Sequence, residues 1–299
     1  MDAVSSLQIG ATFLLNVGFA WLVGAWFARH WLQSNGTSRD EFEPALRKFD
    51  LLAAALSAVG SVVALLAATA VMADVGLRQA CPLFWMMVSS TDYGHAGGIT
   101  IVAMAVLFVV RLSSGTGRGS DIAVALTLAA FAVTRASMGH AGEAGYWTAV
   151  LAAEAIHFFA IGLWTGTVLV SACYCLNAKR IRAVGVGAVD RYLDLMSHAA
   201  MLAVTAIVIT GAYSGWHRVG TAEHLLHTYY GVTLLLKVAL VLVALALGGY
   251  NKFIGLQAAS RSSVGVGLVR TVLQIESVLL LGAIFVAAVL TSQQPPTAT

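Results

Sequence analysis

Residues 51–73 read LLAAALSAVGSVVALLAATAVMA, a run of 23 residues without a charged side chain. A helix of about 20 apolar residues spans the ~30 Å hydrocarbon core of a bilayer. In that environment a helix has the further advantage that it satisfies its own backbone hydrogen bonds without water. This stretch therefore predicts a membrane-spanning helix.

Seven further apolar stretches contain few charged residues, so the sequence predicts an all-α polytopic membrane protein with eight transmembrane helices. Of the 299 residues, 59% are hydrophobic and 10% are charged, whereas soluble domains carry about 25% charged residues. We expect a single integral membrane domain over residues 1–299, because the loops are short. The predicted helices cover residues 6–28, 50–74, 93–112, 120–139, 147–176, 191–215, 227–251 and 266–291.

Two loops have a composition of their own. Residues 34–48, SNGTSRDEFEPALRK, mix both charge signs and are expected to form a solvated loop on the inner side. Residues 75–90, VGLRQACPLFWMMVSS, are semi-polar with a tryptophan and two methionines. This second pattern is typical of a short interfacial helix, which we expect on the outer surface.

Basic residues gather on one side of this arrangement. Only Arg78 and Arg218 lie in loops after even-numbered helices, and Arg135 and Lys237 fall within helices. Because positively charged loops remain in the cytoplasm, both termini and the even-numbered loops are predicted to face outward. The remaining basic residues all follow odd-numbered helices: Arg29, Arg39, Arg47, Lys48, Arg111, Arg118, Lys179, Arg180, Arg182, Arg191, Lys252, Arg261 and Arg270.

A short internal similarity links the two halves of the chain. Thr-x-Tyr-Gly opens the third predicted helix at Thr91 and the seventh at Thr228, and Asp-Leu recurs at Asp50 and Asp194. An offset of four helices returns the chain to the same side, so the pattern is compatible with two four-helix parallel repeats. Chance matches between residues common at membrane interfaces explain it equally well.

Five histidines fall on the outward side, where basic residues are scarce. Neutral imidazole is the commonest transition-metal ligand, and methionines such as Met86 add thioethers that favour Cu(I). A row of amphipathic side chains at the headgroup level explains each histidine singly, but five beside methionines favour a metal site. The five are His95, His140, His217, His224 and His227.

Glu154 and His157 give a second candidate, three residues apart in the fifth predicted helix. This spacing aims both side chains at one neighbour, as in the metal sites of helix bundles, and ionisable groups at this depth mark sites or pathways. A Glu–His hydrogen bond that ties helices together is the alternative. His198 and Met201 share a face of the sixth helix nearer the inner side. From outside to inside, the order of these groups suits a soft cation moving inward.

Cys173 and Cys175 end the fifth helix near the inner side, two residues apart and therefore on different faces. Whether they bind metal stays open, and Cys81 is too far from them for a disulfide within the chain. The remaining deep charges, Lys237 and Glu276, are expected to form an ion pair between the last two helices.

Other function classes lack their signatures in this chain. No GxxxxGKS or GxxxxGKT motif is present, which argues against ATP-driven pumping by this chain alone. The basic residues are dispersed, so no nucleic-acid partner is predicted. We therefore predict a binding or transport protein in the lipid bilayer and not an enzyme.

One alternative uses the same histidines differently. His157 and His198 have similar estimated depths on adjacent helices, so they are also candidates for the axial ligands of a b-type haem. A membrane cytochrome of this kind would show a Soret band. Against it, no helix carries the two deep histidines that a two-haem arrangement needs.

Short motifs mark the second half of the chain. The seventh helix opens on Thr-x-Tyr-Gly, continues through Leu-Lys and closes on Asn-Lys, and an Arg followed by a Glu opens the last one. Upstream, Gly-His-Ala is followed by His and by Trp-x-Gly. The residues are Thr228, Tyr230, Gly231, Leu236, Lys237, Asn251, Lys252, Arg270 and Glu276, and upstream Gly139, His140, Ala141, His157, Trp164 and Gly166.

With these motifs the chain resembles the copper resistance protein D family over nearly all of its length, most densely over residues 187–296. Family members often carry Trp-x-Gly-Gly where this chain has WTGT, with Thr167 in place of the second glycine. That departure bears on local packing and not on the family.

The resemblance implies a bacterial inner-membrane protein that moves copper ions from periplasm to cytoplasm beside a periplasmic copper-binding protein. The outward side then becomes the periplasm, with periplasmic N- and C-termini. A copper-delivery factor for the assembly of a respiratory oxidase would use the same ligands, so this alternative stays open.

Overall fold

A computed structural model describes residues 3–34, 39–113, 117–139, 142, 145, 147–177, 186–219 and 221–293. Within these ranges every regular element is helical, and eight stretches are long and apolar enough to cross a membrane. The predicted all-α fold with eight spans is thereby confirmed. The elements are α1 (Ala3–Ser34), α2 (Arg39–Met72), α3 (Leu77–Ser90), α4 (Asp92–Leu112), α5 (Arg118–Ser137), α7 (Ala149–Val170), η1 (Ser171–Cys175), α9 (Val186–Val219), α10 (Ala222–His227), α11 (Tyr229–Tyr250), η2 (Asn251–Gly255), α12 (Leu256–Ala259) and α13 (Ser263–Leu290), where η1 and η2 are π-helical turns.

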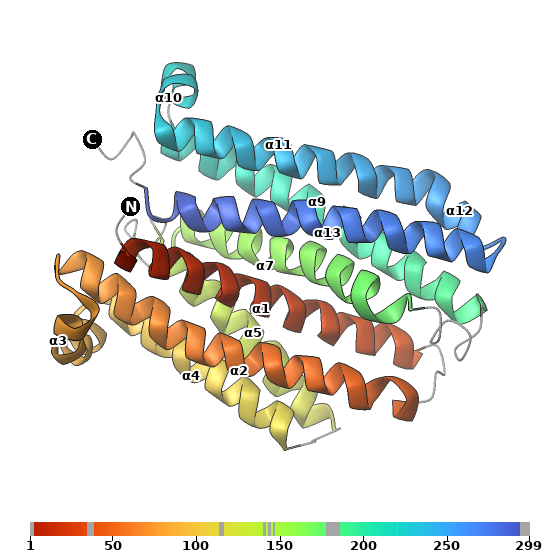
Figure 1. Ribbon diagram of the computed structural model, residues 1–299, viewed down its shortest axis with the longest axis horizontal. Helices are drawn as coiled ribbons and strands as arrows, with labels where there is room; N and C mark the ends of the chain where they lie inside the picture. The colour runs from red at the N-terminus through yellow and green to blue at the C-terminus, as the bar shows by residue number, and fades with distance from the viewer. Residues whose placement is uncertain are drawn as a thin grey trace.

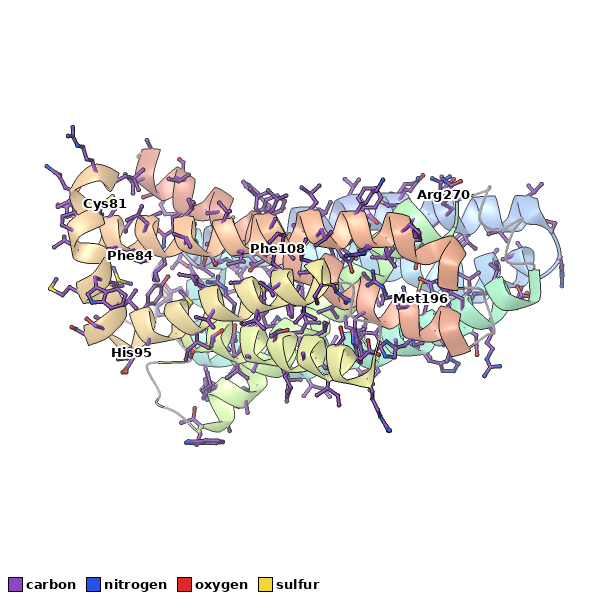
Figure 2. All side chains as sticks on the ribbon, turned by 90° about the horizontal axis from the view of Figure 1, so that it is seen from below. Cys81, Phe84, His95, Phe108, Met196 and Arg270 are labelled. Atoms are coloured by element: carbon purple, nitrogen blue, oxygen red, sulfur yellow. The ribbon has the colours of Figure 1, made fainter. Side chains whose placement is uncertain are left out.

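The spanning helices run side by side along the long axis of the molecule, and α1 begins at the same end at which α13 finishes (Figure 1). This end carries α3 and α10, and we call it the α10 end; α12 marks the opposite end, the α12 end. α3 crosses the α10 end and carries Cys81 and Phe84 there (Figure 2). A short helix in this position agrees with the interfacial helix expected for residues 75–90.

Two boundaries differ from the expectation. α2 begins at Arg39, so much of the stretch expected to be a solvated loop is helical. Glu, Ala, Leu, Arg and Lys dominate that stretch, and all of them have high helix propensity. The seventh predicted helix, 227–251, starts two residues later than expected, at Tyr229, because Thr228 adopts an extended backbone between α10 and α11.

Thr91 and Thr228 occupy the same local structure at the starts of α4 and α11. Thr91 Oγ1 accepts a hydrogen bond from Gly94 N at 2.9 Å, and Thr228 Oγ1 accepts one from Gly231 N at 3.0 Å. Each threonine caps the N-terminus of a spanning helix and follows a shorter helix. A Cβ on either glycine would overlap backbone atoms of that shorter helix. Both Thr-x-Tyr-Gly motifs therefore make the same turn.

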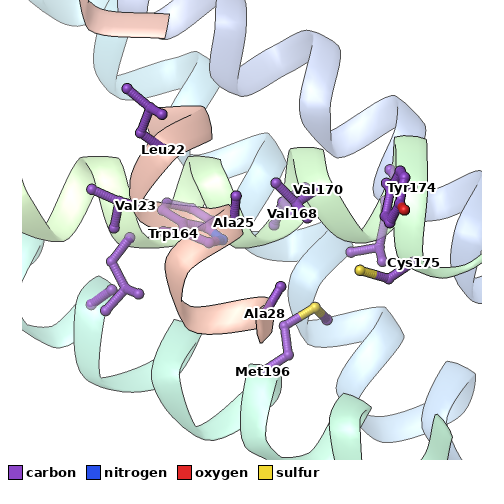
Figure 3. Close-up of a cluster of buried hydrophobic side chains, with 14 of the residues drawn as sticks. Leu22, Val23, Ala25, Ala28, Trp164, Val168, Val170, Tyr174, Cys175 and Met196 are labelled. Carbon is purple, nitrogen blue, oxygen red and sulfur yellow. The ribbon is translucent and has the colours of Figure 1, made fainter. Parts of the chain in front are cut away.

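α1 and α7 form the centre of the bundle (Figure 1). Their backbones lie close together at Gly24 and Gly166, where a Cβ on either residue would overlap the other helix. Small residues allow transmembrane helices to approach this closely. Near the crossing, Phe19 stacks on Phe131 with ring centroids 4.5 Å apart. Side chains from α1, α7 and α9, including Trp164, pack together in the core (Figure 3).

The half of the bundle formed by α1, α2, α4 and α5 packs differently from the half formed by α7, α9, α11 and α13. In the first half α2 lies against α4, with Leu65 filling the space beside Gly97. In the second half α9 packs on α7 and α11 packs on α13, whereas the backbones of α9 and α11 come close to each other at few points. The space between these two helices is a cavity, with α7 and α13 forming its remaining walls.

Candidate functional site

Polar side chains join α7 to α9 near the α10 end. Glu154 Oε2 lies 2.8 Å from Arg218 Nη2 and accepts a hydrogen bond from Ser214 Oγ at 3.1 Å. One turn deeper, His157 Nδ1 lies 2.9 Å from Thr210 Oγ1. The three α9 residues are spaced four apart and so share one face. Glu154 and His157 face one neighbouring helix, as their spacing predicts, but each bonds to α9 and not to the other.

His157 is buried, with 8% of its surface exposed, and lines a small cavity of about 70 Å³. Asn16 of α1 and Lys237 of α11 line the same cavity. Asn16 Oδ1 is buried and has no hydrogen-bond partner within the described part of the chain. We call this space the His157 cavity. Trp164 lines it and also lines the larger cavity next to it.

The larger cavity, of about 310 Å³, lies between α9 and α11, and its volume is typical of small-ligand sites. We call it the α9–α11 cavity. Met196 and Met201 line it from α9, Asn251 and Lys252 from η2, and Glu276 from α13. The π-helical geometry of η2 shifts the register of the helix at this wall, and such turns are frequent at functional sites.

Glu276 is the most deeply buried charge of this cavity, with 1% of its surface exposed. Its Oε1 accepts a hydrogen bond from Trp164 Nε1 at 2.9 Å, and its Oε2 has no partner among the described residues. The predicted ion pair with Lys237 is not formed. Lys237 lines the His157 cavity instead, because similar depth along two helices does not make their side chains point toward each other.

The histidines predicted at the outward side lie on separate elements. His95 is exposed on α4 at the α10 end (Figure 2), and His217 is exposed on α9. On α10, His227 is exposed and His224 directs its Nδ1 at a backbone carbonyl oxygen 3.1 Å away. His140 lies outside the described residues. Within the residues that the structure describes, no three His, Cys, Asp or Glu side chains come together as metal ligands would.

His198 points away from the core of the bundle. Its side chain is 65% exposed, and its Nδ1 lies 2.9 Å from the carbonyl oxygen of Asp194. Met201, three residues later, is 40% exposed but borders the α9–α11 cavity, where its sulfur contacts Lys252 Nζ. The structure therefore brings Met201, but not His198, to a cavity.

The same placement bears on the haem hypothesis. His157 bonds to Thr210, which is twelve residues along α9 from His198. At 1.5 Å per residue this separation is about 18 Å. Two axial ligands of one iron must both reach the metal, so the arrangement does not fit a b-type haem held by His157 and His198.

The two inner cysteines point to different sides, as their spacing predicts. Cys173 is exposed and Cys175 is buried. Both belong to the π-helical turn η1, which is held from two neighbouring helices. Ser171 Oγ donates to Met196 Sδ of α9 at 3.0 Å, and Arg270 Nε of α13 donates to the carbonyl oxygen of Ala172 at 3.0 Å.

Sequence reasoning missed a buried charge cluster toward the α12 end. Asp50 of α2 is fully buried, and its Oδ2 lies 2.5 Å from Arg29 Nη1 of α1 and 3.5 Å from Arg111 Nε of α4. Its Oδ1 accepts a hydrogen bond from Trp21 Nε1 at 3.1 Å. A signal was available, since one acidic and two basic residues lie at helix boundaries on one predicted side. One carboxylate thus ties three helices together.

Two family models match the chain. The copper resistance protein D model covers residues 187–290, from α9 to α13. The model for the copper resistance protein D-like N-terminal domain covers residues 1–148. The chain belongs to the copper resistance protein D family. This family relation, with the eight spans, makes it a multi-pass, copper-handling membrane protein.

No curated protein and no solved structure matches the chain. Residues 149–186, which include α7, lie outside both ranges matched to the copper resistance protein D family. Thr167, where the family often has glycine, is fully buried, and its Oγ1 donates to the Leu163 carbonyl oxygen at 2.8 Å. The departure is accommodated because the hydroxyl bonds to its own helix.

Proposed function

We propose that this member of the copper resistance protein D family moves copper ions from the periplasm toward the cytoplasm through the second half of its bundle. The observation that carries the proposal is that the His157 cavity and the α9–α11 cavity share Trp164 in their walls. They extend from His157 past Glu276 to Met201, and so combine imidazole, carboxylate and thioether groups, a set that suits copper. We propose this binding and movement, and not catalysis, as the activity.

Capture of the ion is proposed at the α10 end. His95, His217, His224 and His227 lie on three elements there, and His140 is a further candidate. Because these histidines are separated from one another, we propose that one imidazole ring at a time captures the copper ion, and not a preformed site with several ligands. A periplasmic copper-binding protein that supplies further ligands is the proposed partner.

Lys237 works against cation passage at the His157 cavity, because an ammonium group repels a cation that approaches it. Glu154 and Arg218 belong to the same charged group, and the carboxylate partly offsets the two cations. We propose that Lys237 sets an electrostatic barrier that limits how fast copper passes His157.

We also propose that the two halves are parallel repeats within one integral membrane domain over residues 1–299. The matching turns at Thr91 and Thr228 support this, since both connect a short helix to a spanning helix through the same cap and glycine contact. Asp50 and Asp194, the other repeated pair, differ in environment, because the first is buried and the second is exposed.

The proposed orientation places the α10 end, with both termini, in the periplasm of a bacterial inner membrane. Two native cysteines test it, because Cys81 is exposed on α3 and Cys173 is exposed in η1. A membrane-impermeant maleimide added to spheroplasts is expected to label wild-type protein and Cys173→Ser, but not Cys81→Ser. Labelling that survives Cys81→Ser and disappears with Cys173→Ser would reverse the orientation and the direction of transport.

The transport proposal predicts that His157→Ala slows copper accumulation. Cells that express the wild-type protein are expected to accumulate copper several times faster than cells that express this variant at an equal membrane level, measured by elemental analysis. His30→Ala is the matched control and should behave as wild type, because His30 lies near the α12 end of α1 and lines neither cavity. Equal accumulation in wild type, His157→Ala and cells without the protein would refute the transport role.

A further inference from the structure

We propose that Glu276, Met196 and Asn251 form a Cu(I)-binding site in the α9–α11 cavity. This inference rests on the proposed copper transport and deepens it by naming where the ion pauses. The three side chains come from α13, α9 and η2 and line one cavity of about 310 Å³. The sequence pattern had pointed to other residues for metal binding.

The first support is the incomplete bonding of Glu276. Its Oε2 is buried and lacks a hydrogen-bond partner, and only the neutral Trp164 indole binds the other oxygen. Within the described residues Glu276 forms no ion pair with a basic side chain. A buried carboxylate without a positive partner is costly. A bound cation would remove that cost.

Asn251 is the second incompletely bonded group. It is buried in η2, and neither its amide oxygen nor its amide nitrogen has a partner in the described structure. More than nine in ten buried polar groups have at least one partner. Two such exceptions on the wall of one cavity indicate a ligand that completes both.

The third support is sulfur. Met196 is buried and lines the cavity, and its thioether accepts one hydrogen bond from Ser171 Oγ. Met201 is in contact with Lys252 Nζ, so we leave it out of this site and keep it as a candidate for the path beyond it. Thioether ligands select Cu(I) among biological metal ions, whereas Mg²⁺ and Ca²⁺ take oxygen ligands alone.

Charge balance points to the same oxidation state. At Glu276 itself, one carboxylate and one Cu(I) ion together carry no net charge, which suits a buried position inside the membrane, whereas Lys252, the other charged residue of the cavity wall, contacts Met201. Cu(II) would leave one positive charge without a partner.

The cavity is also not a general result of this architecture, because in the first half α2 and α4 close the corresponding space with Leu65 against Gly97.

The test is an anaerobic titration of the full-length protein in nanodiscs with Cu(I), in competition with bathocuproine disulfonate. Glu276→Gln is expected to lose one copper equivalent or to bind it at least tenfold more weakly. Met196→Leu should weaken binding several-fold and reduce the Cu–S signal in X-ray absorption. Met104→Leu, a fully buried methionine of α4, is the matched control and should bind as wild type.

If Glu276→Gln does not fold, the comparison of Cu(I) binding by Met196→Leu and by Met104→Leu tests the site. Equal copper binding by Met196→Leu, Glu276→Gln and wild type would overturn the site.

Copper accumulation in cells, measured in parallel, keeps the two proposals apart. The site would be overturned, and transport left standing, if wild-type cells accumulate copper while Glu276→Gln and Met196→Leu bind Cu(I) as well as the wild type does. Binding at Glu276 without accumulation would uphold the site and overturn transport. A purified wild-type protein that binds no Cu(I) would overturn the site outright.

Discussion

Replacement of Asp50 with alanine is expected to destabilise the folded protein by about 3–5 kcal/mol, the usual cost of removing one partner from a buried ion pair. Asp50 is fully buried, and its carboxylate lies 2.5 Å from Arg29 and 3.5 Å from Arg111. Without it, the guanidinium groups of Arg29 and Arg111, which come from different helices, lose this buried carboxylate. The contact with Trp21 is lost as well.

Thermal unfolding in nanodiscs measures this effect through Cys175, the buried thiol of η1, in a background that carries Cys81→Ser and Cys173→Ser. A thiol-reactive dye should reach Cys175 at a markedly lower temperature in Asp50→Ala. Asp194→Ala removes an exposed aspartate and should leave the transition within about 0.5 kcal/mol. If the two variants unfold alike, Asp50 does not hold these helices together.

The fold could be read from hydrophobicity because each span buries its own backbone hydrogen bonds and needs a length set by the bilayer. The boundaries of the helices were harder to predict from the sequence. Helix propensity extends α2 back to Arg39, and the cap at Thr228 moves the start of the predicted seventh helix to Tyr229 and separates α11 from α10. Both differences arise where the chain leaves the apolar core, so that local backbone chemistry decides the structure.

The candidate site was accessible only in part. Spacing alone placed Glu154 and His157 toward one neighbour, since side chains three apart share a helix face. Their partners on α9 depend on how each helix is rotated about its own axis, which periodicity does not fix in a membrane where most faces are apolar. For the same reason, His198 was predicted to line the ion path but is exposed on the surface of the bundle. Likewise, Glu276 was predicted to pair with Lys237, but it accepts a hydrogen bond from Trp164 instead.

The two buried carboxylates, Asp50 and Glu276, have different environments in the two halves of the bundle. In the first half, Asp50 is neutralised by two arginines from separate helices, an arrangement that keeps α1, α2 and α4 in one geometry. In the second half, Glu276 has only a neutral donor and faces a cavity between two helices whose backbones come close at few points. We infer that the first half serves as a rigid support and that the second half provides the space and the charge for the ion.

The two halves of the bundle meet at the crossing of α1 and α7, so substitutions there are expected to have the second large effect. A Cβ added to Gly24 would lie 2.7 Å from Gly166 Cα and closer still to the Gly166 carbonyl group. Backbone atoms cannot rotate away as a side chain can, so the helices must separate. We expect Gly24→Ala to cost about 1–3 kcal/mol, the range for overpacked cores, and to slow copper accumulation by displacing His157 and Trp164 of α7.

Gly10→Ala is the matched control, because it makes the same change on the same helix and its Cβ meets no atom within 4 Å. The Cys175 thermal assay should separate the two variants clearly, and equal transitions would show that α1 and α7 do not depend on this contact. Gly166→Ala should resemble Gly24→Ala. The double variant should cost much less than the sum of the two, because both substitutions act on one contact and such neighbours are not additive. Once the first methyl group has separated the helices, the second finds the space already open.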